Sequence, residues 1–318
     1  MWISGLYLAL VSYPNQMIPG AHFPKEYLLV EEEKFEKVFD ITWRQPDGIV
    51  IEDASDHLLL GFDPVLVGIP CYHERSVPAR TFLCFSFQGK EIARLELVQI
   101  LEERLEHRFL VCQAVHGRHR LVSTFARAID NLRESFRRQP LRNVGLFSNR
   151  YEQIRIAYAI PRPVRLAEVS DGMLYNFFPA DLNGGVDDMH YVFSFRRGSR
   201  AAEQVHKTGR MIVSDVDRGF GGFVFPSAKN HMQDMQQPEH FMTGNQRSLR
   251  FNWLLPQHCI RYTELELNKT VDLGFHILYF FAIAGSQQLT EEPRLAYLHR
   301  FAAEWRRNHQ LAHPFLQP

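Results

Sequence analysis

Alternating apolar and polar residues characterise the second half of the chain. In residues 154–160 every second side chain is a large apolar one, a spacing that predicts a half-buried β-strand. Residues 277–283 are apolar at consecutive positions and predict a central strand that is covered on both faces. Many short strands around one helix indicate a closed barrel, because closure removes exposed sheet edges. Further strands are predicted at 164–169, 191–195, 211–216 and 259–267.

The first half of the chain mixes helical and strand periods. Two apolar runs, 81–87 and 91–95, flank Gln88-Gly89-Lys90, which predicts a hairpin turn. Apolar residues then recur at helical spacing over 97–105 and again over 122–138, so helices are expected there. Other strands are predicted at 48–51, 57–61, 65–69 and 108–114.

The character of the sequence changes near residues 141–149, which we interpret as a linker. We therefore predict a mainly β protein with α+β additions: a mixed α+β region of unknown role over 1–145, and a closed β-barrel over 150–318. The barrel is expected to end in an amphipathic helix over 291–310. A distant duplication of the two halves stays open, because both contain strands and a basic helix. The apolar start, 1–11, predicts a buried first strand or, alternatively, a processed segment.

Composition excludes several classes of function. The chain has 36 Lys+Arg and 36 Asp+Glu, so it lacks the basic field of a dedicated nucleic-acid binder. The four cysteines form no CxxC pair, which argues against a zinc site or a disulfide framework and favours a reducing cytoplasm. No apolar run approaches the length of a membrane span, so we expect a soluble protein without a membrane partner. A small-molecule ligand fits this composition better.

The turn after the strand at 191–195 carries the most specific chemistry. Arg196, Arg197 and Gly198 form the turn, Ser199 can cap a short helix, and Gly209 can end that helix. Guanidinium groups and free N–H groups at a helix N-terminus are the parts that hold a phosphate. A solvated turn with a capped helix is the alternative interpretation.

Neighbouring motifs give this turn a context. Pro161-Arg162-Pro163 precedes it, followed by Ser170-Asp171-Gly172 and by Asn176. After it comes a strand that contains Gly274 and His276 in a Gly-x-His pattern. In this order the motifs of residues 154–285 resemble the flavin reductase-like family of FMN-binding split barrels.

The resemblance implies a Greek-key split barrel, usually a homodimer, that binds FMN or FAD near the subunit interface. It also implies that NAD(P)H reduces the flavin, often to supply a partner monooxygenase, so the protein would be an oxidoreductase and a flavoprotein. By position, Asn176 and the 178–183 loop would approach the flavin, and His276 would face its ring or the nicotinamide as the catalytic candidate. The residues expected near the phosphate are Ser194, Arg196, Arg197, Ser199 and Arg200.

The loop at 181–188 departs from the family pattern. Asp181, Asp187 and Asp188 stand where the family has small hydroxyl residues and prolines. Carboxylates near a phosphate would repel it unless the arginines compensate. A non-catalytic relative that serves as a binding or assembly module is therefore the alternative function, and a flavin- or haem-sequestering protein is the third.

Two further groups of residues are candidates for chemistry. Cys71, His73 and Glu74 offer three ligand types within four residues, but a zinc site needs another ligand at a defined distance, so we expect no metal there. The His- and Met-containing segment 231–258 is interpreted as a surface excursion, with an active-site flap as the alternative.

Overall fold

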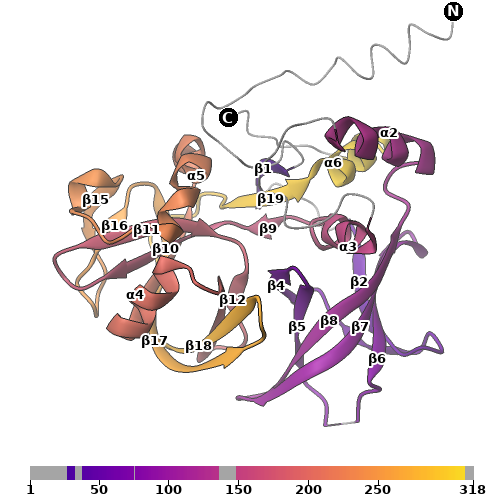
Figure 1. Ribbon diagram of the computed structural model, residues 1–318, viewed down its shortest axis with the longest axis horizontal. Helices are drawn as coiled ribbons and strands as arrows, with labels where there is room; N and C mark the ends of the chain where they lie inside the picture. Colours follow the sequence, from indigo (N-terminus) through magenta and orange to yellow (C-terminus); the bar gives the residue numbers. More distant parts are fainter. Residues whose placement is uncertain (1–26, 33–37, 75, 136–147, 312–318) are drawn as a thin grey trace, which may run out of the picture.

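The computed structural model describes residues 27–32, 38–74, 76–135 and 148–311. Within these residues each half of the chain forms a seven-stranded antiparallel sheet, and a three-stranded sheet joins the two halves (Figure 1). This part of the chain is mainly β, which confirms the predicted fold class. Its helices are too short or too polar for any of them to cross a membrane. The strand predicted at 1–11 lies outside the described residues, as does most of the predicted linker.

The N-terminal sheet curls around its own apolar interior. Its β6–β7 hairpin turns at Gln88 and Gly89, whose φ angles are 49° and 73°. Two successive positive φ values are typical of a type I′ turn, whose twist matches that of the flanking strands. The predicted hairpin is therefore confirmed. The strands are β2 (Asp40–Arg44), β3 (Val50–Asp53), β4 (Leu58–Phe62), β5 (Val65–Cys71), β6 (Arg80–Phe87), β7 (Lys90–Arg104) and β8 (Arg108–His119).

The C-terminal sheet has the curl of a half-barrel and carries two long connections. Helix α4 (Arg200–Thr208) links its fourth and fifth strands. Residues 217–258 link the fifth and sixth strands and contain α5 (Gly221–Ser227), β15 (Thr243–Arg247) and β16 (Leu254–Pro256). The strands of the sheet are β10 (Arg165–Ser170), β11 (Tyr175–Ala180), β12 (Asn183–Gly185), β13 (His190–Arg196), β14 (Arg210–Val216), β17 (Cys259–Asp272) and β18 (His276–Gln288).

The two large sheets have the same strand order. The N-terminal order is β3-β2-β6-β7-β8-β5-β4, and the C-terminal order is β11-β10-β14-β17-β18-β13-β12. When the seven strands of each sheet are numbered along the chain, both orders become 2-1-5-6-7-4-3. The N-terminal region is therefore a second sheet of the same topology, and the α+β character predicted for it comes from flanking helices.

A small sheet ties the beginning, middle and end of the described chain together. Strand β19 (Leu295–His299) lies between β1 (Tyr27–Glu31) and β9 (Arg162–Pro163). Beside it lie α2 (Thr124–Ser135), α3 (Asn149–Ala157) and α6 (Arg300–Asn308) (Figure 1).

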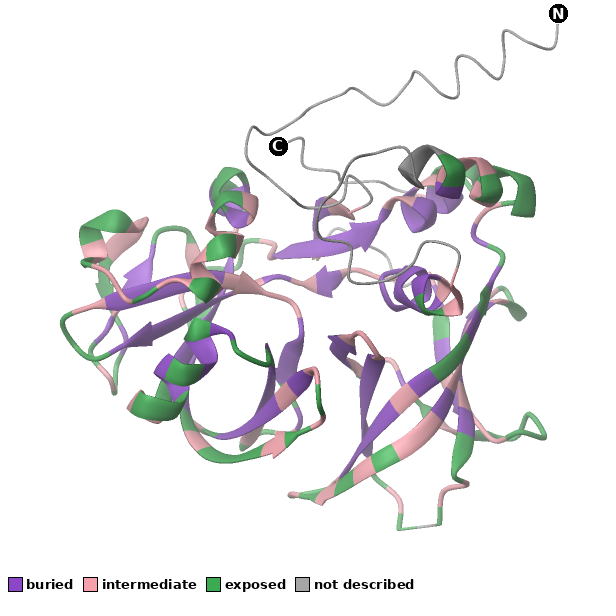
Figure 2. Ribbon diagram, in the orientation of Figure 1, coloured by how far each residue is buried: buried purple, intermediate pink, exposed green. Residues whose placement is uncertain are grey.

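Buried apolar residues of the described chain form three clusters, and two of them, one large and one small, contain residues of both halves. In Figure 2 the strands that face one another across the molecule carry buried residues, whereas outward positions are exposed. The smaller of these two clusters, here called the junction cluster, consists of Leu60, Leu66, Phe109, Val111, Val186, Val192, Leu278 and Phe280. Lys269 also forms an ion pair with Glu103 across the junction. Both halves thus bury apolar surface against each other, and this burial stabilises the contact between them.

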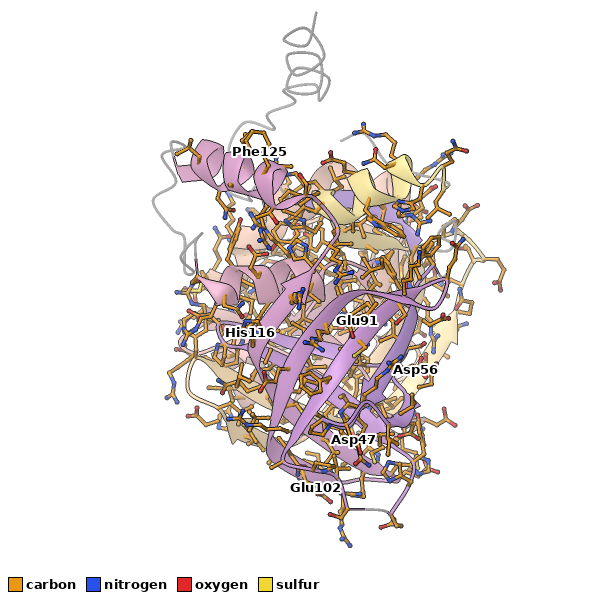
Figure 3. All side chains as sticks on the ribbon, turned by 90° about the vertical axis from the view of Figure 1, so that its right-hand side faces the viewer. Asp47, Asp56, Glu91, Glu102, His116 and Phe125 are labelled. Atoms are coloured by element: carbon orange, nitrogen blue, oxygen red, sulfur yellow. The ribbon has the colours of Figure 1, made fainter. Side chains whose placement is uncertain are left out.

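The opposite side of the N-terminal half faces solvent. Figure 3 shows this side, with Glu91, Glu102 and His116 on its strands and Phe125 on α2. Glu102 there pairs with Arg108, and Glu96 pairs with Arg80. The other half packs elsewhere, on β5 and β8, through Leu66, Phe109 and Val111, which alternate along these strands with residues of the interior cluster.

Three predicted elements are wrong. Residues 97–104 form the end of strand β7, where an irregularity between Gln99 and Leu101 inserts Ile100 and so interrupts the strict alternation of a strand. Residues 154–157 belong to helix α3 and not to a strand. Consecutive residues of this helix are buried, so the alternation of large and small side chains does not reflect a buried and an exposed face. The first part of the predicted tail helix is strand β19, and the helix begins only at Arg300.

Candidate functional site

Strands β13 and β18 position three of the predicted site residues. In their antiparallel ladder Arg196 lies opposite His276, and Ser194 lies opposite Leu278. Alternate residues of a strand share a face, so Ser194 and Arg196 lie on the face of Val192. Because Val192 and Leu278 belong to the junction cluster, this face is the one that meets the N-terminal half.

His276 is buried at the centre of this group. Its side chain is 1% exposed, and its Nδ1 lies 3.1 Å from the Ser194 hydroxyl. The ring of Phe62, from β4 of the other half, stands edge-on to the imidazole with 5.2 Å between ring centres. Among the described residues no group forms a hydrogen bond with His276 Nε2. Either tautomer therefore leaves one unused hydrogen-bonding position on the buried ring, which a ligand could occupy.

Burial controls the charge of this imidazole. Loss of hydration, followed by the nearby positive charge of Arg196, lowers the pKa of His276 to about 4. The ring is therefore neutral at physiological pH and can orient a polar ligand without adding charge.

The three arginines of the turn differ in their availability. Arg196 lies over the ring of Phe275, 4.9 Å from its centre, and has no ion pair within the described residues. Arg197 donates to Gly274 O at 2.7 Å and pairs with Asp272. Arg200 pairs with Asp234 and Glu203. Of the three, Arg196 is the guanidinium that an anionic ligand could engage without displacing a carboxylate.

Helix α4 begins and ends as the sequence predicts. The Ser199 hydroxyl accepts a hydrogen bond from Ala202 N at 3.3 Å, and Gly209 closes the helix with a φ of 67°. This cap uses the Ala202 N–H, and the other N–H groups of the first turn have no partner within the helix and can bind an anion.

Asn176 lies apart from the group at the junction. Its side-chain amide donates to Gln204 Oε1 at 2.8 Å and to the carbonyl of Asn230 at 3.1 Å. These contacts hold α4 and the 217–258 connection against β11. The structure brings Ser194, Arg196 and His276 together, with Arg197 close by, whereas Asn176, Ser199 and Arg200 lie around α4; their roles stay predictions.

The acidic loop is satisfied internally. Asp181 is half-buried and accepts a hydrogen bond from the Tyr158 hydroxyl, and loss of hydration raises the pKa of the Asp181 carboxyl. Asp187 accepts from the Nδ1 of His190 at 2.8 Å and from the backbone N of Met189 at 2.8 Å. Two of the three carboxylates expected to repel a phosphate are thus engaged by neighbouring groups.

A second group of ligand-type residues lies at one end of the N-terminal sheet. Single ligand atoms of Glu52, Cys71 and His73 lie within 4.8 Å of one another. Three protein ligands and a water would satisfy a tetrahedral metal ion such as zinc. The sequence offered Cys71 and His73 but not Glu52, which only strand β3 brings beside them.

The C-terminal sheet also buries a pair of carboxyl groups. Glu168 and Glu264 both stand opposite Ile212 in neighbouring ladders, so they share one face of the sheet. Burial and then the charge of Glu264 raise the pKa of Glu168 well above its usual value. Glu264 accepts hydrogen bonds from the backbone of Arg250 and Phe251. Glu264 thus ties the 217–258 connection to the sheet.

Phe62 is the site residue that sequence reasoning missed. It belongs to a short strand of the half that carries no recognisable motif, and its contact with His276 spans more than two hundred residues of chain. No local pattern could have indicated such a pairing.

Solved structures similar to this chain cover about half of it. An FMN-binding protein from Thermus thermophilus is 17% identical, over 43% of this chain and 79% of that one, with a TM-score of 0.36. The NADH:FAD oxidoreductase SgcE6 of Streptomyces globisporus is 12% identical, over 49% and 93%, with a TM-score of 0.40. BorF, the flavin reductase component of a bacterial two-component tryptophan halogenase, is 15% identical, over 47% and 92%, with a TM-score of 0.40.

Part of the chain is thus similar in fold to flavin reductase-like FMN-binding proteins. No protein-family model and no curated protein sequence matches the chain. These similarities assign no role to any residue.

Proposed function

We propose that the protein binds a flavin nucleotide at the junction of its two halves, FMN or alternatively FAD, and that NAD(P)H reduces the bound flavin. The observation that carries the proposal is the group of Ser194, Arg196 and His276. It combines a hydroxyl, a guanidinium without an ion pair among the described residues, and a buried neutral imidazole with an unused nitrogen.

These residues fit a flavin in two ways. An isoalloxazine ring presents carbonyl oxygens and ring nitrogens, which suit the free position on His276. A flavin phosphate suits Arg196 together with the N–H groups of the first turn of α4. When bound, the flavin itself supplies the hydride chemistry. The residues of the chain would bind and orient the ligand, and Phe62 and Phe275 would keep water away from His276.

The setting of such an activity follows from the same proposal. All four cysteines are free thiols, which fits a reducing cytoplasm. A cytoplasmic flavin reductase could supply reduced flavin to a partner monooxygenase, as the resemblance implies. The resemblance implies a homodimer, whereas the alternative is that the two halves of a single chain form the site. The molecular mass of the native protein distinguishes the two.

One observation favours the alternative function. Arg197 and Arg200 are already paired with Asp272, Asp234 and Glu203, which reduces the positive charge available to a phosphate. A non-catalytic relative that binds a ligand or assists assembly would be compatible with such pairing.

The experiment is a titration of FMN with the purified protein, followed by anaerobic addition of NADH. We expect flavin fluorescence to be quenched at micromolar FMN and the bound flavin to bleach with NADH. Quenching without bleaching would favour the binding module, and no quenching at all would contradict the proposal.

A pair of matched variants tests the position of the site. Arg196→Gln should weaken FMN binding by about tenfold, because a charge-assisted hydrogen bond is lost. Arg210→Gln is the control, since Arg210 also lies over a phenylalanine ring, 5.0 Å from the centre of Phe251, but stands elsewhere on the sheet. Equal affinities of both variants and the natural protein would refute the assignment of Arg196.

A further inference from the structure

The two large sheets pack through equivalent strands. The third strands of the two sheets, β4 and β12, contact each other, and β4 also contacts β13. The fourth and seventh strands of both sheets supply residues to the junction cluster: β5 and β8 on one side, β13 and β18 on the other. A contact in which the same surface is used on both sides is the arrangement found at two-fold interfaces between subunits.

Leu58 and Gly184 lie at the centre of this contact. A Cβ added to Gly184 would lie 2.4 Å from a methyl carbon of Leu58, so a larger residue there would force the Leu58 side chain to shift. Leu58 pairs with Gly68, which pairs with Val111. In the other sheet Gly184 pairs with Val192, and Val192 pairs with Phe280. The ladders therefore match position by position around an approximate two-fold axis.

This match defines a counterpart of the candidate site. Arg196 lies four residues after Val192, and His276 lies four residues before Phe280. In the N-terminal sheet, Tyr72 lies four residues after Gly68, and His107 lies four residues before Val111. The rings of Tyr72 and His107 are in contact, with 4.9 Å between their centres.

The chemistry of the counterpart differs from that of the site. Pro70 stands where Ser194 stands in the other half, and Tyr72 is 58% exposed. Burial, followed by the charges of Asp56, Glu52 and Asp187, raises the pKa of Tyr72. An acidic environment without a guanidinium at the Arg196 position disfavours an anionic ligand.

We propose that the N-terminal half is a second copy of the C-terminal sheet that occupies the position of a partner subunit. One chain then forms one complete site, to which Phe62 of the N-terminal half contributes by positioning His276. The flavin as ligand rests on the proposed function, whereas the pairing of the halves does not. The surface that would join two subunits is already covered within the chain, so the protein should be a monomer.

The mass of the native protein tests the pairing without reference to any ligand. Native mass spectrometry and light scattering of the full chain should give about one chain mass, 37.2 kDa, at micromolar concentration. A stable dimer of two chains would overturn the proposal. Titration with FMN should saturate at one equivalent per chain, and two equivalents would overturn the single-site conclusion.

A pair of phenylalanine variants tests the contribution of the N-terminal half. Phe62→Ala should expose His276, raise its pKa from about 4 toward its usual value, and weaken FMN binding by about tenfold. The control is Phe87→Ala, because Phe87 is also half-buried in the N-terminal half but packs against Trp305. That variant should leave both quantities unchanged.

Nuclear magnetic resonance titration of His276 reports the pKa directly. An unchanged His276 pKa in Phe62→Ala would overturn the role of Phe62. If the natural protein fails to bind FMN, the proposed function fails, while the mass and the His276 titration still decide the pairing of the halves.

Discussion

The N-terminal and C-terminal sheets share a strand order but differ in what connects their strands. Between the fourth and fifth strands the C-terminal sheet has the arginine turn and α4, whereas the N-terminal sheet has only residues 72–79. Between the fifth and sixth strands the C-terminal sheet has residues 217–258, and the N-terminal sheet has a tight turn at Gln88 and Gly89. The paired strands provide a scaffold in both halves, and the connections provide the chemistry in one of them.

A residue in the fourth strand shows the same contrast. Ser194 can bind the neutral imidazole of His276, whereas Pro70 at the matching position has no hydroxyl. The N-terminal sheet instead gathers Glu52, Cys71 and His73 at the end where α4 has no counterpart. Equal topology therefore does not imply equal function, because function depends on the side chains at strand ends.

The largest expected effect comes from cutting the contact between the halves. Phe280→Ala removes a buried ring of the junction cluster that stands edge-on to Phe109, and it should lower the free energy of unfolding by about 3–5 kcal/mol. Phe281→Ala is the control, because Phe281 is also buried but belongs to the interior of the C-terminal sheet. Chemical denaturation measures both losses.

Hydrogen exchange distinguishes the two variants. Phe280→Ala should raise the exchange rate of β5 and β8 in the N-terminal half, since these strands lose their partner. Phe281→Ala should raise exchange mainly in the C-terminal sheet. If Phe280→Ala left the N-terminal strands protected, the two halves would be independent, and the comparison between them would lose its structural basis.

An effect of intermediate size is expected from acid. The pKa of His276 is about 4 in the folded protein and about 6.5 in an unfolded chain. As the pH falls, the unfolded state therefore takes up a proton before the folded state does. The free energy of unfolding should decrease by about 3 kcal/mol as the pH falls from above 6.5 toward 4. Denaturation at a series of pH values should show this loss, and His276→Leu should reduce its slope.

The exposed histidine His116 provides the control for that series. His116→Leu should leave the pH dependence unchanged, because His116 lies on the solvent-facing side of the N-terminal half (Figure 3). Burial lowers the pKa of His57 and His299 as well, so some acid sensitivity should persist in His276→Leu. A variant with the full slope of the natural protein would show that His276 is not buried in solution.

The smallest expected effect concerns the helix that distinguishes the halves. Ser199→Ala removes the cap of α4 and should cost about 1 kcal/mol of stability, because Ala201, Ala202 and Val205 bury the helix in the C-terminal core. Ser123→Ala removes a matching cap from α2, whose Ala126 N donates to Ser123 Oγ at 3.1 Å. This loss should be smaller, because α2 carries an exposed apolar residue, Phe125, and is less firmly packed. Equal losses would contradict the view that α4 is integral to its sheet.

Much of the C-terminal half could be predicted from the sequence because its signals are local. Ser199 and Gly209 mark the ends of α4 through the conformations of single residues, and both predictions are confirmed. The turn at Gly172, with a φ of 98°, likewise follows from glycine between two strands. The predictions failed where packing overrode the local pattern. Irregular pairing in β7 imitated a helix, and burial of α3 on most sides hid the polar face by which a helix is recognised.

The candidate site was predictable only in part, for the same reason. The residues Ser194, Arg196 and His276 stood in recognisable motifs, but their shared face became visible only when β13 paired with β18. The expected repulsion by the acidic loop depended on the partners of Asp181 and Asp187, which are Tyr158 and His190. A sequence shows the charge of a residue but not the group that neutralises it.

By itself the sequence determined the mainly β composition, most of the strands, the capped helix and the arginine turn, because each depends on neighbouring residues. Only the tertiary structure decided that the two halves repeat one strand order and face each other through equivalent strands. It also decided that Phe62 covers His276 and that two of the three turn arginines are already paired. The physical reason is that burial and pairing join residues far apart in the chain, and these contacts set which polar groups stay available to a ligand.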